Sequence, residues 1–204
     1  MKILLATGNR HKVEELTAIL NKNEGSASFE FVCLADYPEL PPVVEDGETL
    51  EQNAVKKAIS ASLATGLWAL ADDTGLEVPA LNGEPGVYSA RYAGPNCSFQ
   101  DNCDKLLAEL EGKKGTERDA AFRCVVALST PQGAVRINVG TLEGRITESP
   151  FGGDGFGYDP IFLVPHLEKT LAEMTADEKN AISHRWEAVA GVIPWLAQIG
   201  QGVG

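Results

Sequence analysis

The sequence has few of the residues that build metal centres, disulfide frameworks and membrane spans. Its four cysteines are scattered without a CxxC pair, and its three histidines form no HxxxH or HExxH pattern. This argues against a transition-metal site and a disulfide framework, and reduced thiols are expected. The apolar run near the N-terminus is too short for a signal-peptide core, and no run is long enough for a membrane span. We therefore expect a cytoplasmic protein without membrane contact.

Basic residues are also in short supply. The chain has 17 Lys and Arg against 29 Asp and Glu, a formal net charge of −12. A surface of this charge repels the phosphate backbone, so no nucleic-acid partner is expected. A small anionic ligand is still compatible with the sequence, if a local basic cluster or a divalent cation receives it.

What is present is an ordinary globular composition. Hydrophobic residues make up 44% of the 204 residues, enough for one well-buried domain or two small lobes that share a core. Strands are predicted at 2–6, 67–71, 119–129 and 134–142, and helices at 12–22, 49–64, 98–112 and from 175 onwards. Because these elements alternate and mix, we predict an α/β fold, with a mixed β-sheet and flanking helices.

Two adjacent aspartates, Asp72 and Asp73, follow the apolar run at 67–71, and we expect a turn at Gly75 to end this strand. The aspartyl-nucleophile phosphatase motif also follows an apolar strand, but it needs D-x-D, with both carboxylates on one side of the chain. Neighbouring strand residues point to opposite faces, so that alternative fits poorly. Together with Glu45, the pair suits Mg²⁺, which prefers oxygen ligands. A capped turn plus a salt bridge stays open as a structural alternative.

Two further segments place polar residues where helices begin. TGNRHK, residues 7–12, follows the first predicted strand, so that helix N–H groups and Lys12 can receive an anion. In EDGETLEQNAVKKA, residues 45–58, Asn53 and Lys57 are spaced i, i+4 and share one helix face. The alternatives are a plain strand–helix turn for the first segment and a solvated helix face for the second.

The last two segments lie towards the C-terminus. In FGYDP, residues 156–160, Phe156 and Tyr158 offer flat faces for stacking on a ligand, with core packing as the alternative. The segment KNAISHRWEA spans residues 179–188. If it formed a single helix, Lys179 and Arg185 would point in directions about 240° apart. A break at Ser183 would instead place His184 and Arg185 at the positive end of a second helix.

Together these segments closely resemble the inosine triphosphate pyrophosphatases, the non-canonical purine NTP pyrophosphatases of the bacterial dITP/XTP type. The matching segments, between residues 5 and 188, are LATGNRHK, QNAVKKA, ADDTGLEV, PGVYSARYAG, GFGYDPIF and EKNAISHRWEA. One departure is Leu142-Glu143 in TLEGRI, where the family has Trp-Pro. The resemblance implies Mg²⁺-dependent hydrolysis of ITP, dITP and XTP to the monophosphate and pyrophosphate. It also implies one domain over residues 1–204, two lobes around a central nucleotide-binding cleft, and a homodimer.

The resemblance further implies roles for individual residues. Asp73 corresponds to the proton acceptor, and Glu45, Asp72 and Asp73 correspond to the metal site. Thr74 stands where bacterial members usually have Ser, and His184 and Arg185 are candidates for reading the carbonyl at position 6 of the base. The predicted substrate-binding residues, with Asn53 added for the face it shares with Lys57, are Thr7, Gly8, Asn9, Arg10, His11, Lys12, Asn53, Lys57, Thr74, Phe156, Gly157, Tyr158, Asp159, Lys179, His184 and Arg185.

Two other functions fit parts of the pattern. A pyrophosphatase for modified pyrimidine nucleotides would use a related fold, but the intact SHR and FGYDP segments speak against it. A non-catalytic nucleotide-binding regulator would not need the acids, yet Glu45, Asp72, Asp73 and Lys12 are all present. Pyrophosphate release from ITP, measured with and without Mg²⁺, distinguishes these alternatives.

Overall fold

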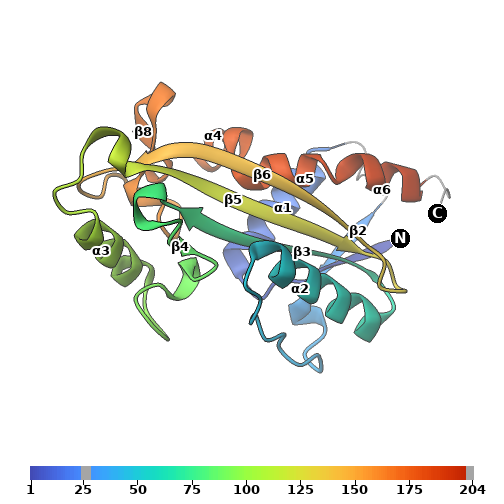
Figure 1. The fold of residues 1–204 in the computed structure, drawn as a ribbon. Helices are drawn as coiled ribbons and strands as arrows, with labels where there is room; N and C mark the ends of the chain where they lie inside the picture. Colours follow the sequence, from blue (N-terminus) through green and yellow to red (C-terminus); the bar gives the residue numbers. More distant parts are fainter. Residues whose placement is uncertain (24–28, 201–204) are drawn as a thin grey trace. The chain divides into compact units, whose positions relative to one another are not determined.

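The computed structural model describes residues 1–23 and 29–200 and has a mixed α/β fold (Figure 1). Its strands are β1 Lys2–Leu5, β2 Glu30–Cys33, β3 Trp68–Glu77, β4 Pro85–Gly86, β5 Asp119–Ser129, β6 Val135–Ile146, β7 Phe162–Val164 and β8 Lys169–Thr170. Its helices are α1 Arg10–Asn21, α2 Leu50–Thr65, α3 Phe99–Glu109, α4 Ala176–Ile182, α5 His184–Ala190 and α6 Ile193–Gly200. Every helix in the described part of the chain is too short or too polar to span a bilayer.

The chain divides into two compact units. The first comprises Met1–Asp73, Cys124–Gly140 and His184–Gly204, and the second comprises Thr74–Arg123 and Thr141–Ser183. Strands β3, β5 and β6 each contribute residues to both units. The division between the units falls directly after Asp73, within the DDTG segment that the sequence predicts to be functional.

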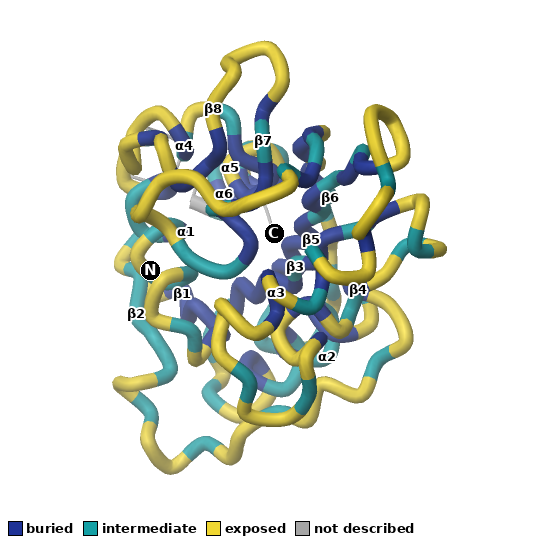
Figure 2. The backbone as a smooth tube through the Cα atoms, turned by 90° about the vertical axis from the view of Figure 1, so that its left-hand side faces the viewer, coloured by how far each residue is buried: buried dark blue, intermediate teal, exposed yellow. Residues whose placement is uncertain are grey.

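In the first unit, β1 pairs in parallel with both β2 and β3. All three residues Ile3, Leu4 and Leu5 are buried, as expected for a parallel strand that is covered on both faces. Helices α1, α5 and α6 pack with Leu70 in one apolar cluster, whereas α2 lies on the other side of β3 from α5 (Figure 1). Strands β1 and β3 are largely buried, β2 is half-buried to exposed, and the connecting loops are largely exposed (Figure 2).

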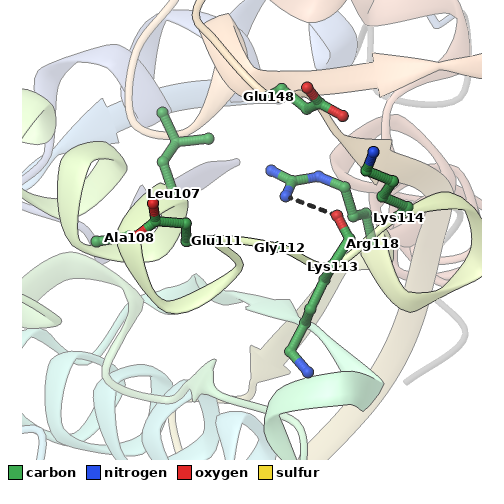
Figure 3. Close-up of a pocket in the computed structure, with 8 residues that line it drawn as sticks. All are labelled: Leu107, Ala108, Glu111, Gly112, Lys113, Lys114, Arg118 and Glu148. Carbon is green, nitrogen blue, oxygen red and sulfur yellow. Dashed lines mark hydrogen bonds between the residues drawn. The ribbon is translucent and has the colours of Figure 1, made fainter.

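In the second unit, β7 pairs antiparallel with both β6 and β8, and β4 pairs antiparallel with the end of β3. Its separate apolar cluster includes Leu106 of α3, Tyr158 and Phe162. The buried Arg118 donates to the carbonyl oxygens of residues 110, 113, 146 and 147. A pocket of about 240 Å³ lies beside it, lined by Leu107, Ala108, Glu111, Gly112, Lys113, Lys114, Arg118 and Glu148 (Figure 3). Because Arg118 is bonded to backbone, we assign it to holding these segments together.

Most of the predicted helix boundaries are confirmed. Thr49 caps α2, which Gly66 closes in the left-handed conformation, and capping boxes start α3 and α4. Helix α1 begins at Arg10, ahead of the predicted residue 12, because the Asn9 side chain caps it. All four cysteines lie in the described part of the chain and are free.

The expected turn at Gly75 is wrong. Strand β3 continues to Glu77, because Leu76 and Glu77 pair with Gly86 and Pro85 of β4. Asp72 and Asp73 therefore lie inside a strand rather than at its end. The pairing of β1 with β3 does end nearby, at Leu70, so both aspartates lie just beyond the end of a parallel neighbour.

Candidate active site

Asp72 is buried on one face of β3 and contacts two cationic side chains. Its Oδ2 lies 2.9 Å from Lys12 Nζ of α1 and 3.4 Å from Arg185 Nε of α5. Arg185, whose side chain is 2% exposed, also pairs with Glu15 of α1. Burial acts to raise the pKa of Asp72, but Lys12 and Arg185 outweigh it and hold the pKa well below its usual range. Asp72 is thus an ionised carboxylate at neutral pH.

Asp73 points to the opposite face, as the alternation of a strand predicts, and contacts α2. Its Oδ1 lies 3.0 Å from Lys57 Nζ, and its Oδ2 accepts a hydrogen bond of 3.2 Å from Asn53 Nδ2. Burial raises the pKa of Asp73 above its usual value, and the nearby Lys57 and Lys12 offset only part of this rise. A carboxylate with a raised pKa is suited to accepting a proton near neutral pH.

Glu45 is brought to Asp73 through one ammonium group. Lys57 Nζ lies 3.1 Å from Glu45 Oε2 and 3.0 Å from Asp73 Oδ1, so both carboxylates converge on a single cationic centre. Burial acts to lower the pKa of Lys57, but Asp73, Asp72 and Glu45 outweigh it and raise the pKa. Lys57 therefore remains an ammonium ion between the two acids.

This geometry fits a divalent cation at Glu45 and Asp73. Both side chains supply carboxylate oxygens, the ligand type that Mg²⁺ prefers, and they already converge on one positive charge. Asp72, the third predicted ligand, is not brought to them but lies with Lys12 and Arg185. Within residues 1–23 and 29–200, no set of three His, Cys, Asp or Glu side chains is gathered as a preformed metal site.

The predicted phosphate loop joins β1 to α1. Asn9 Oδ1 accepts hydrogen bonds from the backbone N–H groups of His11 and Lys12, at 3.0 and 3.3 Å. Two of the helix N–H groups expected to receive an anion are thus capped internally. Thr7 Oγ1 accepts from the Asn9 N–H, and the Lys12 side chain extends to Asp72. Of the other predicted members, Arg10 and His11 are exposed, with Arg10 Nε 3.0 Å from Glu14 Oε1, and a Cβ at Gly8 would meet nothing within 4 Å.

A second group of predicted residues lies in the second unit. Asp159 Oδ2 accepts from Lys179 Nζ at 2.7 Å and from the Phe156 N–H at 2.8 Å. Lys179 Nζ also lies 4.6 Å from the centre of the Phe156 ring, in a cation–π arrangement. Asp159 and Lys179 are buried, so this ion pair fixes the half-buried Phe156. Thr74 begins this unit and is also half-buried.

Tyr158 is placed differently from Phe156. It is 4% exposed and belongs to the apolar cluster of the second unit, where its hydroxyl donates to the Ser89 carbonyl at 2.9 Å. The Gly157 carbonyl accepts from Cys103 Sγ of α3. For Tyr158, the structure favours core packing, the alternative named from the sequence.

The break predicted at Ser183 is confirmed. Helix α4 ends at Ile182, Ser183 has extended backbone angles of −69° and 148°, and α5 begins at His184. His184 and Arg185 are both buried. Arg185 lies in the first unit with Asp72 and Glu15, while Lys179 lies in the second. Recognition of the base by His184 and Arg185 stays a prediction.

Glu15 is a charged member of the Asp72 cluster that none of the sequence motifs includes. Its carboxylate pairs with Arg185, which is 170 residues away in the chain. Glu15 lies three residues after Lys12 on α1, so the two side chains occupy neighbouring positions on one helix face. That spacing is the signal that could have included Glu15.

The amino-acid sequence of the chain is clearly similar to those of known proteins. The model of the Ham1 family matches residues 3–195. The chain belongs to the Ham1 family. It is 53% identical to a dITP/XTP pyrophosphatase of Elusimicrobium minutum, covering 92% of this chain and 95% of that protein. It is 50% identical to a dITP/XTP pyrophosphatase of Geobacter sulfurreducens, covering 93% of each.

Solved structures of Ham1 proteins have the same fold. The HAM1 protein of Coxiella burnetii matches with a TM-score of 0.86 at 41% identity, over 97% of this chain and 99% of that one. The Ham1 protein of Staphylococcus aureus matches with a TM-score of 0.84 at 39% identity, over 96% of this chain and 98% of that one. The family and the mixed α/β fold expected from the sequence are both confirmed.

Proposed function

We propose that this Ham1 chain hydrolyses the non-canonical purine nucleoside triphosphates ITP, dITP and XTP to the monophosphate and pyrophosphate. Curated relatives named dITP/XTP pyrophosphatase support the substrate class. The observation that carries the proposal is the convergence of Glu45 and Asp73 on Lys57 Nζ, at 3.1 and 3.0 Å. The two carboxylates can hold a divalent cation, and the ammonium group beside them can bind phosphate oxygens. Together they suit a triphosphate that binds as its complex with a cation.

In the proposed reaction, water attacks a phosphorus atom and the α–β phosphoanhydride bond breaks. Asp73 accepts the proton of the attacking water, consistent with its raised pKa. Lys57 receives phosphate oxygens when the triphosphate displaces its present carboxylate contacts, and Lys12 offers phosphate the N–H donors that its contact with Asp72 leaves over. Positioning and charge neutralisation supply most of the catalysis of phosphoryl transfer, so a covalent nucleophile is not needed.

The proposal includes Mg²⁺, held by Glu45 and Asp73. Bound Mg²⁺ neutralises negative charge on the triphosphate and on the leaving pyrophosphate. Asp72 keeps Lys12 and Arg185 in place on the other face of β3. Its lowered pKa keeps it ionised at neutral pH.

Recognition of the base is proposed for Phe156 of the FGYDP segment and for His184 and Arg185 of the SHR segment. Phe156 supplies a ring whose position is fixed by Asp159 and Lys179. Stacking on this ring accepts any base, so selectivity needs polar groups as well. We include in the proposal a cytoplasmic location, expected from the lack of a signal-peptide core, and a homodimer, which the family resemblance implies.

The test measures pyrophosphate release from dITP, XTP, dATP and dGTP, with Mg²⁺ and with excess EDTA. We expect release from dITP and XTP only when Mg²⁺ is present, and much slower release from dATP and dGTP. Asp73→Asn should lower the rate by about 10²- to 10⁴-fold, the usual contribution of a positioned acid or base. The matched control is Asp46→Asn, because Asp46 is an exposed acid next to Glu45 that pairs only with the surface Lys56 among the ion pairs described.

Two results would overturn the proposal. One is a folded Asp73→Asn variant with near-normal turnover, which would remove Asp73 from the reaction. The other is a wild-type enzyme that ignores dITP and XTP, or prefers a modified pyrimidine triphosphate. The control Asp46→Asn should retain wild-type turnover, because its side chain lies outside the cluster.

A further inference from the structure

The acid-bearing loop that precedes α2 is attached to that helix by consecutive contacts. Glu45 pairs with Lys57, and Asp46 pairs with Lys56. The next two residues of the loop, Gly47 and Glu48, donate their backbone N–H groups to the side chains of Asn53 and Gln52. Among these α2 side chains, Asn53 is the most buried, at 1% exposure.

Asn53 uses both ends of its amide at once. Its Oδ1 accepts from the Gly47 N–H at 2.8 Å, and its Nδ2 donates to Asp73 Oδ2 at 3.2 Å. The reverse orientation of the amide would turn a donor towards the N–H and an acceptor towards the carboxylate, so only this orientation satisfies both partners. Asn53 is therefore a neutral bridge between the loop that carries Glu45 and the strand that carries Asp73.

The bridge also orients the Asp73 carboxylate. Lys57 binds Oδ1 and Asn53 binds Oδ2, so two donors, one on each oxygen, fix the plane of the group. Lys57 carries a charge that phosphate oxygens compete for, whereas the amide of Asn53 does not depend on that charge. When a triphosphate draws Lys57 away, Asn53 still holds Asp73.

We propose that Asn53 is a positioning residue for hydrolysis, which sets the Asp73 carboxylate and the Glu45 loop relative to each other. This inference rests on the roles proposed above for Asp73 and Glu45. It replaces the prediction that Asn53 contacts substrate, because both of its polar atoms are bonded within the protein. Positioning matters at this scale, since a displacement of about 1 Å can cost about 10²-fold in rate.

The test compares three variants. Asn53→Ala removes both bonds, and Asn53→Asp keeps an acceptor for the Gly47 N–H but replaces the donor to Asp73 by a carboxylate oxygen that repels it. Gln52→Ala is the matched control: Gln52 also accepts a loop N–H, from Glu48 at 2.7 Å, but it is exposed and has no bond to Asp73 among those described. Circular dichroism and thermal unfolding establish which variants are folded, and if Asn53→Ala is not, the isosteric Asn53→Asp carries the comparison.

We expect both Asn53 variants to lose about 10- to 100-fold in kcat for dITP, the range found when groups that hold ligating carboxylates are removed. KM for dITP should stay within about threefold, because the substrate itself loses no contact. Gln52→Ala should retain wild-type kcat. Amide hydrogen exchange of the segment around Gly47 should speed up in Asn53→Ala and stay protected in Asn53→Asp, which separates the two halves of the bridge.

Wild-type enzyme and Asp73→Asn are measured in the same series. If the wild type is active and Asp73→Asn is inactive, but folded Asn53→Asp retains full kcat, the positioning role is overturned while the proposed function stands. A rise in KM with unchanged kcat would also overturn it, by restoring the role of a substrate contact. If Asp73→Asn is fully active, the assignment of Asp73 fails first.

Discussion

Replacing Asp72 by Asn tests the idea that this carboxylate is a structural anion. The substitution keeps the shape of the side chain and removes its charge, so that Glu15 is the remaining carboxylate partner of the buried Arg185 among the ion pairs described. Removing one partner of a buried ion pair costs about 3–5 kcal/mol of the free energy of unfolding. Because Lys12 is partly exposed and can turn to solvent, we expect a loss at the lower end, about 3 kcal/mol. A domain is stable by only about 5–15 kcal/mol, so this loss is easily measured.

The dependence on pH separates the lost charge from a change of shape. The pKa of Asp72 is lower in the folded protein than in the unfolded chain, whose value is about 3.9. Its stabilisation is therefore fully present above that pH and is lost as the pH falls through the folded-state pKa. The difference in stability between wild type and Asp72→Asn should be constant from pH 7 to pH 5, and should shrink below about pH 4.

The measurement is unfolding in urea, followed by circular dichroism at pH 7, 5 and 3.5. Asp46→Asn is the control, because Asp46 is an exposed acid whose pKa is also lowered, by Lys56. No measurable loss of stability is expected from that control. The reasoning is refuted if Asp72→Asn loses less than about 1 kcal/mol at pH 7, well below the range for a broken buried pair. It is also refuted if the loss is undiminished at pH 3.5.

Two further predictions follow, one for the first unit and one for the second. Gly47→Ala should lower kcat by about 10-fold, because the new Cβ would lie 2.6 Å from Asn53 Oδ1 and force the loop off its bridge. The control in the same kinetic assay is Gly153→Ala, where a Cβ meets nothing within 4 Å, and equal rates for the two variants would contradict the bridge. Lys179→Met should lower the free energy of unfolding by about 3–5 kcal/mol, since it leaves the buried Asp159 carboxylate without its ammonium partner. Adding Asp159→Asn should recover part of this loss in urea unfolding, and a further loss of similar size would argue against a charge effect.

Local chemistry explains why much of the fold was predictable from the sequence. A hydroxyl cap such as Thr49, a closing Gly66 and a serine that begins a capping box act within a few residues of one another. Strand alternation likewise acts locally, and it separates Asp72 from Asp73 without knowledge of their partners. The spacing of Asn53 and Lys57 predicts that they converge, and the structure has them converge on Asp73.

The features that could not be predicted from the sequence depend on contacts between residues that the sequence pattern does not relate. Strand β3 passes through Gly75 because the short β4 supplies a pairing partner from beyond the intervening loop. Arg185 and Glu15 are 170 residues apart, and no periodicity relates them. The prediction that Asn53 contacts substrate has the same origin, because the Gly47 N–H bond that occupies its Oδ1 depends on how the loop folds back.

The charges on the two faces of β3 distinguish the roles of the adjacent aspartates. The sequence alone does not show which of the two accepts a proton and which stays ionised. Asp72 contacts two cationic groups, and the guanidinium of Arg185 is buried with it, so Asp72 stays ionised. Asp73 shares the single ammonium of Lys57 with the more exposed Glu45, and burial raises its pKa. A group can take up a proton during a reaction only if its charged form is not held too strongly. Of the two aspartates, Asp73 is therefore the one whose protonation can change during catalysis, while Asp72 keeps the cations on its face in place.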